Sequence, residues 1–286
     1  MIDFQAIQCK MEENELKKYL QEIKNGEKTW EKDKDKNVLL VKSMLSYIGT
    51  TDSELRDHLI YSTFCQCVID NLFDHQLLSG LLDYCLSESL LFKGIGEKDT
   101  DTVFTRSFSS LFIAVTLYKD NRDDFLPANV VSNAKDSLIK YINLENDLRG
   151  FVPMKGWAHS IAHVADAIDE LVQSKKIEQN DYLEILTTLW NKMFTSNSVY
   201  IHGEDERILR PIRVMLDKGL EISEVERLIT NIPSELQIRK EQITEENYWF
   251  LVANCKAFLK SLYIQVGSDI HLKDLRQNIE LCLSEI

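Results

Sequence analysis

The chain is poor in the residues that make tight turns. Its 286 residues include only 10 glycines and 4 prolines. A fold built mainly of short strands needs turn residues at short intervals, so this scarcity argues against a sheet-rich protein. Hydrophobic residues still make up 44% of the chain, enough for a large core. The sequence therefore predicts an all-α fold in which long helices are joined by short loops.

Long apolar runs are also missing. The longest run, residues 111–118, is far too short to span a bilayer. The first residues, MIDFQAIQCKMEENE, have neither the basic start nor the apolar segment of a signal peptide. We therefore expect a soluble cytoplasmic protein without a membrane partner.

Positive charge is in deficit. Lysine and arginine number 33 against 46 aspartates and glutamates, which gives a formal net charge of −13. Nucleic-acid backbones and anionic membranes favour basic surfaces. The sequence therefore predicts that neither is a partner.

The six cysteines form no CxxC pair, and most lie within apolar helical patterns, as buried thiols do. This distribution is not that of a disulfide scaffold, and a reducing compartment suits it. Glycine-rich nucleotide-binding patterns and the GxSxG nucleophile motif are absent as well. We expect no cofactor, with a divalent transition metal as the alternative considered below.

Apolar residues recur at helical spacing almost throughout the chain. An N-terminal helix and a charged loop occupy residues 1–37, and one helical domain follows over residues 38–286. The helices are predicted over residues 10–25, 38–48, 51–72, 76–92, 102–120, 128–146, 156–174, 180–195, 205–218, 222–231, 245–265 and 271–285.

Helix pairs recur at roughly 40 residues, the period of HEAT-like and armadillo-like arrays. The repeats are not similar in sequence, so the period depends on helix spacing alone. The sequence favours a curved solenoid of helical hairpins, and a compact multi-helix bundle is the alternative architecture.

The helix predicted over residues 156–174 carries a polar stripe. His159, His163, Asp166 and Glu170 lie at i, i+4, i+7 and i+11, and small or apolar residues occupy the other faces. Two histidines one turn apart with a carboxylate one turn further are a known arrangement of metal ligands. His159, His163 and Asp166 are therefore candidate ligands, with His202 or Glu204 as a possible fourth. Histidines hydrogen-bonded in a polar groove are the simpler interpretation.

Charged side chains precede this helix. Asp147 and Arg149, then Lys155 and Trp157, bracket a short loop and could bind a small anionic or planar ligand. Local ion pairing is the alternative for Arg149 and Lys155. For Trp157, which falls on the apolar stripe of the predicted helix, a core position is favoured. In the helix predicted over residues 102–120, Arg106 shares a face with apolar residues, so it needs an anionic partner. The candidates for that partner are Glu145, Asp147 and Asp166.

Three segments resemble a bacterial family known only as domain of unknown function 2785. They read SELRDHLIY at 53–61, IGEKDTDTVFTRSFSSL at 95–111 and DLRGFVPMKGWAHSIAHVAD at 147–166. With the helices between them they cover most of the chain after residue 38. The resemblance implies neither a substrate nor a cofactor. It implies that the family's signature positions are Arg106, Asp147, Arg149, Lys155, Trp157, His159, His163 and Asp166.

Three hypotheses for function follow. The preferred one is a binding protein whose polar groove, lined by those eight residues, holds a small polar ligand or a segment of a partner protein. The second is a metal-dependent hydrolase with His159, His163 and Asp166 as ligands, and Arg106 or Arg149 stabilising negative charge. The third is a purely structural polar network. The sequence does not decide whether the protein is an enzyme.

Overall fold

The computed structural model describes residues 4, 6, 9–29, 34–267 and 269–286. The chain divides into two compact units, residues 1–176 and 177–286, which are described separately. Their secondary structure is helical apart from one two-stranded hairpin among the described residues. The predicted all-α class is therefore confirmed, whereas the single domain from residue 38 and the curved solenoid stay predictions.

The first unit is helical except for the β1–β2 hairpin. Its elements are α1 (Glu13–Lys24), α2 (Lys34–Ser46), the π-helix η1 (Glu54–Tyr61), α3 (Ser62–Ile69), α4 (His75–Cys85), α5 (Thr102–Asp123), α6 (Ala128–Leu144), β1 (Phe151–Val152), β2 (Gly156–Trp157) and α7 (Ser160–Gln173).

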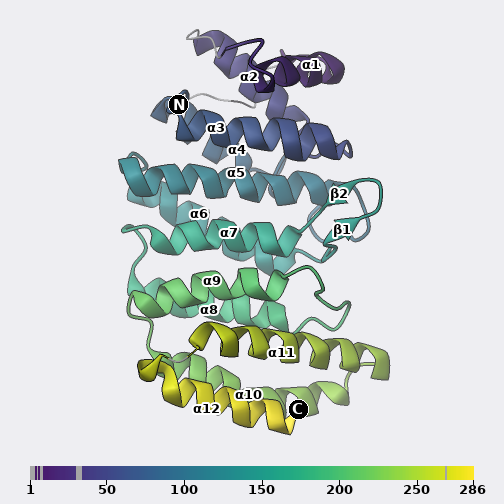
Figure 1. Ribbon diagram of the computed structural model, residues 1–286, viewed down its shortest axis with the longest axis vertical. Coiled ribbons are helices and arrows are strands. Elements are labelled where there is room, and N and C mark those ends of the chain that lie inside the picture. The colour runs from purple at the N-terminus through teal and green to yellow at the C-terminus, as the bar shows by residue number, and fades with distance from the viewer. Residues whose placement is uncertain (1–3, 5, 7–8, 30–33, 268) are drawn as a thin grey trace. The chain divides into compact units, whose positions relative to one another are not determined.

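These helices pack in two layers. Figure 1 shows α3, α5 and α7 side by side, with α4 and α6 behind them. Helix α5 is buried along most of its length and forms the centre of the unit. Several of its buried hydroxyls donate to its own backbone, as where Ser109 Oγ donates to the Thr105 carbonyl at 2.6 Å. Small side chains on both helices let α7 approach α5 closely.

Helices α5 and α7 run in the same direction. Ser107 near the start of α5 contacts His163 near the start of α7, and Asn121 near the end of α5 contacts Glu170 near the end of α7. Both N-terminal ends therefore lie at the end of the layer that carries the β1–β2 hairpin (Figure 1).

The second unit consists of α8 (Gln179–Met193), α9 (Glu204–Asp217), α10 (Ile222–Lys240), α11 (Glu245–Val266), the 3-10 helix η2 (Ile270–Leu272) and α12 (Lys273–Glu285). Helix α11 packs against α8, α9, α10 and α12, so it is the central helix of this unit. Its Phe258 meets Trp190 of α8 edge to face, with ring centroids 5.2 Å apart.

Local chemistry sets several helix starts. Asp74 accepts the Leu77 N–H at 2.9 Å at the start of α4, and Thr244 accepts the Asn247 N–H at 3.3 Å at the start of α11. A reciprocal capping box of Glu178 and Asp181 begins α8. Thr51 and Glu54 have the spacing of a capping box, but Asp52 accepts the Leu55 N–H instead, at 3.1 Å.

Two predicted helix boundaries are also corrected. Helix α7 begins at Ser160, not 156, because residues 156–157 belong to β2. The hairpin itself was not predicted. Helix α10 continues through Pro233 to Lys240, where the sequence predicted a break.

All six cysteines are free. Four of them are buried, and burial raises the pKa of thiols such as Cys255, to about 12. Within the described residues, no helix is both long and apolar enough to cross a membrane.

Candidate functional site

The predicted residues gather at the hairpin end of α5 and α7. They come from the first turns of these two helices, from the loop after α6, and from the hairpin (Figure 1). The sequence order explains the gathering, because residues 145–159 form one connected path from the end of α6 to the start of α7.

Arg106 lies in the interior of this region and is fully buried. Its Nε and Nη2 atoms donate to the two carboxylate oxygens of Glu145 at 2.7 and 2.9 Å. Its Nη1 atom donates to the carbonyls of Lys93 and Gly94 and to Thr102 Oγ1, at 2.8–3.1 Å. The prediction that Arg106 needs an anionic partner is confirmed, and that partner is Glu145. Burial alone would lower the pKa of Arg106, but the hydrogen bonds and charge of Glu145 outweigh it, so the pKa lies above its usual value.

Asp147 connects three segments and is also buried. It accepts hydrogen bonds from Arg149 Nε at 2.8 Å, Arg149 Nη2 at 2.6 Å and the Asp99 N–H at 3.0 Å. Its carbonyl accepts from Ser160 Oγ at the start of α7. Arg149 Nη2 also donates to the Thr100 carbonyl at 2.7 Å. The hydrogen bond to Asp147 raises the pKa of Arg149. These contacts hold the loop before α5 against the loop before α7.

His163 belongs to a hydrogen-bond chain between α5 and α7. Ser107 Oγ donates to the Ala158 carbonyl and lies 2.6 Å from His163 Nδ1. A hydroxyl has one proton, so the network assigns the imidazole proton to Nδ1, which donates to Ser107. Phe108 meets the same imidazole edge to face at 5.2 Å. These contacts fix both the tautomer and the orientation of the ring.

His159 lies immediately before α7 and is not part of the helix. Its backbone adopts the left-handed conformation, with φ 47°, and its N–H donates to the Arg149 carbonyl at 3.0 Å. The ring stacks on Trp157 with centroids 4.4 Å apart and meets His163 edge to face at 5.6 Å. The two histidines are therefore neighbours, as the predicted spacing required, although only His163 lies on the helix.

The hairpin carries exposed apolar side chains. Trp157 is 38% exposed, so the core position predicted for it is wrong. Its ring packs edge to face against the Phe151 ring, with centroids 5.1 Å apart. Met154 at the turn is 97% exposed and has φ 67°. Lys155 pairs with Asp101 at 2.7 Å. Residues Arg149, Phe151, Met154, Lys155 and Trp157 are called the hairpin surface below.

Arg56 supports the hairpin from behind, and sequence reasoning missed it. This fully buried residue of η1 donates from Nη2 to the carbonyls of Lys155 at 2.8 Å and Trp157 at 3.4 Å, and from Nη1 to Thr50 at 2.7 Å. Its guanidinium lies over the Phe104 ring at 4.3 Å, and its Nε lies 2.8 Å from Asp57 Oδ1. Burial lowers the pKa of Arg56 and raises that of Asp57. A short segment, SELRDHLIY, was recognised there, but nothing in it marks this role.

The eight predicted residues thus divide into a buried group and a group whose side chains are accessible to solvent. Arg106, Asp147 and His163 are buried and hydrogen-bonded within the protein, which favours the structural alternative for these three. The partly or well exposed members are Arg149, Lys155, Trp157, His159 and Asp166. Glu145, Ser107 and Arg56 complete the network, and of these only Glu145 was considered from the sequence.

The predicted additional ligands lie in the second unit. The His202 N–H donates to Glu204 Oε2 at 2.9 Å, and Glu204 is buried at the start of α9. Asn254 of α11 holds the preceding loop, because it accepts the Tyr200 N–H and donates to the carbonyls of Thr195 and Ser198 at 2.9–3.0 Å. The metal site with His159, His163 and Asp166, and with His202 or Glu204 as a fourth ligand, stays a prediction.

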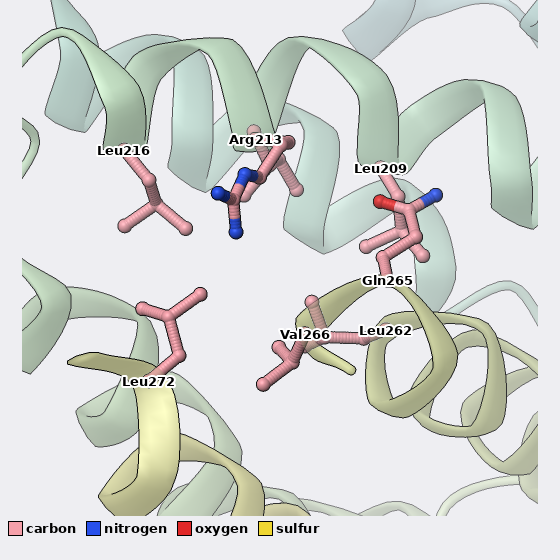
Figure 2. A pocket seen from close by; sticks show the side chains of 8 residues that line it. Leu209, Arg213, Leu216, Leu262, Gln265, Val266 and Leu272 are labelled. Atoms are coloured by element: carbon pink, nitrogen blue, oxygen red, sulfur yellow. The ribbon is translucent and has the colours of Figure 1, made fainter. Parts of the chain in front are cut away.

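Two hollows in the second unit are lined by other residues. Figure 2 shows the first, where apolar side chains of α9, α11 and η2 face one another beside Arg213. Its volume of about 10 Å³ is the space of one water molecule. The second, about 310 Å³, is lined by Lys240, Glu245, Tyr248 and Trp249, each at least partly exposed. None of the eight predicted residues lines either hollow.

A family model described as protein of unknown function (DUF2785) matches residues 91–264, well over half of the chain. The match includes Arg106 and the whole 145–166 region. The segment at 53–61, which carries Arg56, lies outside it, so the resemblance expected from residue 38 onward is confirmed only from residue 91. No curated protein and no solved structure matches the chain.

Proposed function

The chain belongs to this family of proteins of unknown function, and we propose that it is a binding protein that holds a segment of a partner protein on the hairpin surface. The observation that carries the proposal is the contrast between the two parts of the site. A buried, hydrogen-bonded network fixes the loops, and the same loops present exposed aromatic and charged side chains.

The shape of the hairpin surface favours a protein segment over a small polar ligand. A small-molecule site encloses most of its ligand, whereas Met154 at the hairpin turn is 97% exposed. Exposed Phe151 and Trp157 are of the residue types that dominate the centres of protein interfaces. The buried members of the predicted groove would act indirectly, by positioning the loops.

Selection of randomly displayed peptides on the full chain tests this proposal. We expect recovered peptides to lose at least about tenfold in affinity when Met154→Ser is introduced, the loss typical of one well-placed interface residue. Ile270→Ser is the matched control, because Ile270 is an exposed apolar residue of the second unit. If every recovered peptide bound the two variants and the unchanged protein equally, the hairpin surface would not be a binding surface.

The metal-dependent hydrolase is a second candidate, and one observation favours it. Metal-binding imidazoles almost always donate their other N–H to an oxygen acceptor. His163 does so, because its Nδ1–H donates to Ser107, which leaves Nε2 as the ligand atom. Its neighbour His159 lies within 5.6 Å, ring to ring, and Asp166 follows one turn later on α7.

Elemental analysis of untagged protein tests the second candidate. It predicts about one zinc, manganese or iron ion per chain, lost in the His159→Ala/His163→Ala variant. His202→Ala and Glu204→Gln would separately test the predicted fourth ligand. Metal-free protein that zinc, manganese and iron all fail to load would rule the candidate out.

A further inference from the structure

The hairpin turn is an unusual place for a large apolar residue. Met154 combines 97% exposure with a left-handed backbone, a conformation that costs an L-residue other than glycine roughly 1–2 kcal/mol. Phe151 and Trp157 beside it are 49% and 38% exposed. Burial does not explain why these three apolar side chains are clustered here, and backbone preference does not explain a methionine at position 154. Clustered exposed apolar side chains mark interaction sites.

The hairpin is held rigidly. Arg56 donates hydrogen bonds to two of its backbone carbonyls, those of Lys155 and Trp157. The Lys155 ammonium donates to both carboxylate oxygens of Asp101 at 2.7 and 2.8 Å. A side chain at Gly156 would meet the Cβ atom of Ser53 at 2.8 Å, so η1 packs directly against the backbone of β2. A surface that is ordered before binding loses less entropy when a partner binds.

The ion pairs at the hairpin leave one aspartate, Asp99, mostly exposed to solvent. The two cations of the hairpin surface are already paired, Lys155 with Asp101 at 2.7 Å and Arg149 with Asp147 at 2.6 Å. Asp99 is 85% exposed and lies 3.7 Å from Arg149, so most of its carboxylate faces solvent. The chain as a whole has a net charge of −13.

From this combination we infer that the partner segment is basic and carries apolar side chains, an inference that rests on the proposed function. Apolar groups of the segment would cover Met154 and Phe151. Its arginine or lysine side chains would pair with Asp99, the most exposed of these carboxylates, and lie against the aromatic rings, which attract cations. An acidic segment would meet the exposed carboxylates and be repelled.

Three synthetic peptides of equal length test the inference. One alternates arginine with leucine, one glutamate with leucine, and one arginine with serine, and each is titrated against the full chain by fluorescence anisotropy. We expect the arginine–leucine peptide to bind at least about tenfold more tightly than either of the others. Its affinity should fall with added salt, because exposed charges are screened.

Variants locate the binding. Met154→Ser should weaken the arginine–leucine peptide about tenfold, and Ile270→Ser should not weaken it. Asp99→Asn should weaken it about threefold and keep the local backbone, because asparagine tolerates the left-handed conformation that Asp99 adopts, with φ 58°. Asp136→Asn is the matched charge control, since that aspartate is also well exposed and lies on α6.

Several outcomes would overturn the inference. They are equal or tighter binding of the glutamate–leucine peptide, equal effects of Asp99→Asn and Asp136→Asn, and binding to phosphatidylcholine vesicles but to none of the peptides. Failure of the proposed function is distinguishable from these. If displayed peptides require Met154 but are acidic or uncharged, the partner class is wrong and the function stands. If no displayed peptide requires Met154, both are wrong.

Discussion

Arg106 and Glu145 show how much of the region depends on one buried ion pair. Both side chains are completely removed from solvent, so each must have its charge compensated inside the protein. The two-oxygen contact satisfies the carboxylate, and three further acceptors satisfy the guanidinium. Loss of either partner leaves a buried charge without its counterion.

Arg106→Met should therefore lower the free energy of unfolding by about 3–5 kcal/mol. The Arg106→Met/Glu145→Leu double variant should recover much of that loss, because it removes both charges. Urea denaturation measures both changes. Arg227→Met is the control, since Arg227 pairs with Glu224 on the surface and should cost less than about 1 kcal/mol. A cost for Arg106→Met no greater than that of the control would contradict the structural role.

Glu170 near the end of α7 provides a pH prediction. Burial raises the pKa of its carboxyl group above the ordinary glutamate value, against the hydrogen bond from Asn121. Because the folded-state pKa lies above the unfolded one, the folded state binds more protons between the two values. The free energy of unfolding attributable to this group therefore falls as pH rises through that window.

Glu170→Gln should accordingly stabilise the protein at neutral pH and have little effect in buffer more acidic than the ordinary glutamate pKa. Denaturation curves at the two pH values measure the difference, with Glu246→Gln on the exposed surface of α11 as the control. A stabilisation that is equal at both pH values, or present only in acid, would contradict the direction of the shift.

At the scale of elements, the hairpin depends on contact with η1. Gly156 and Gly203 both have φ 80°, but a Cβ atom at Gly156 would meet Ser53, Arg56 and Asp57, whereas one at Gly203 would meet nothing within 4 Å. The two glycines therefore share the same backbone requirement and differ in crowding.

Gly203→Ala should cost about 1–2 kcal/mol, the cost of a left-handed alanine. Gly156→Ala should cost roughly 1–3 kcal/mol more, because overpacking adds to it. Hydrogen exchange, read in the unit that holds each substitution, measures both. Equal costs would mean that η1 does not hold β2 in solution.

The helices could be predicted from the sequence because apolar spacing and caps act locally. Helix α11 was expected over 245–265 and runs from Glu245 to Val266. Pro233 misled the prediction, since a proline removes one hydrogen bond while Ile232 and Leu236 still bury their side chains on the same helix. The hairpin could not be predicted, because Arg56 supports it from 99 residues away in the chain.

The sequence indicated which candidate residues lie near one another but not which of them face solvent. Helical spacing and sequence proximity brought His159 near His163 and Asp147 near Arg149. Spacing does not tell which polar side chains face solvent, so Arg106 and Asp147 were expected in an open groove and lie buried instead. Arg106 and Asp147 are buried because they bind the backbone of the loop before α5, and only folding brings that loop into contact with Asp147.

At the scale of the whole molecule, we propose that the buried polar network positions the hairpin surface for binding. Hydrogen exchange on the full chain with a selected peptide bound tests this claim most directly. The account predicts that peptide binding slows exchange most at residues 149–159. Slowed exchange confined to other helices, with the exchange at 149–159 unchanged, would contradict it.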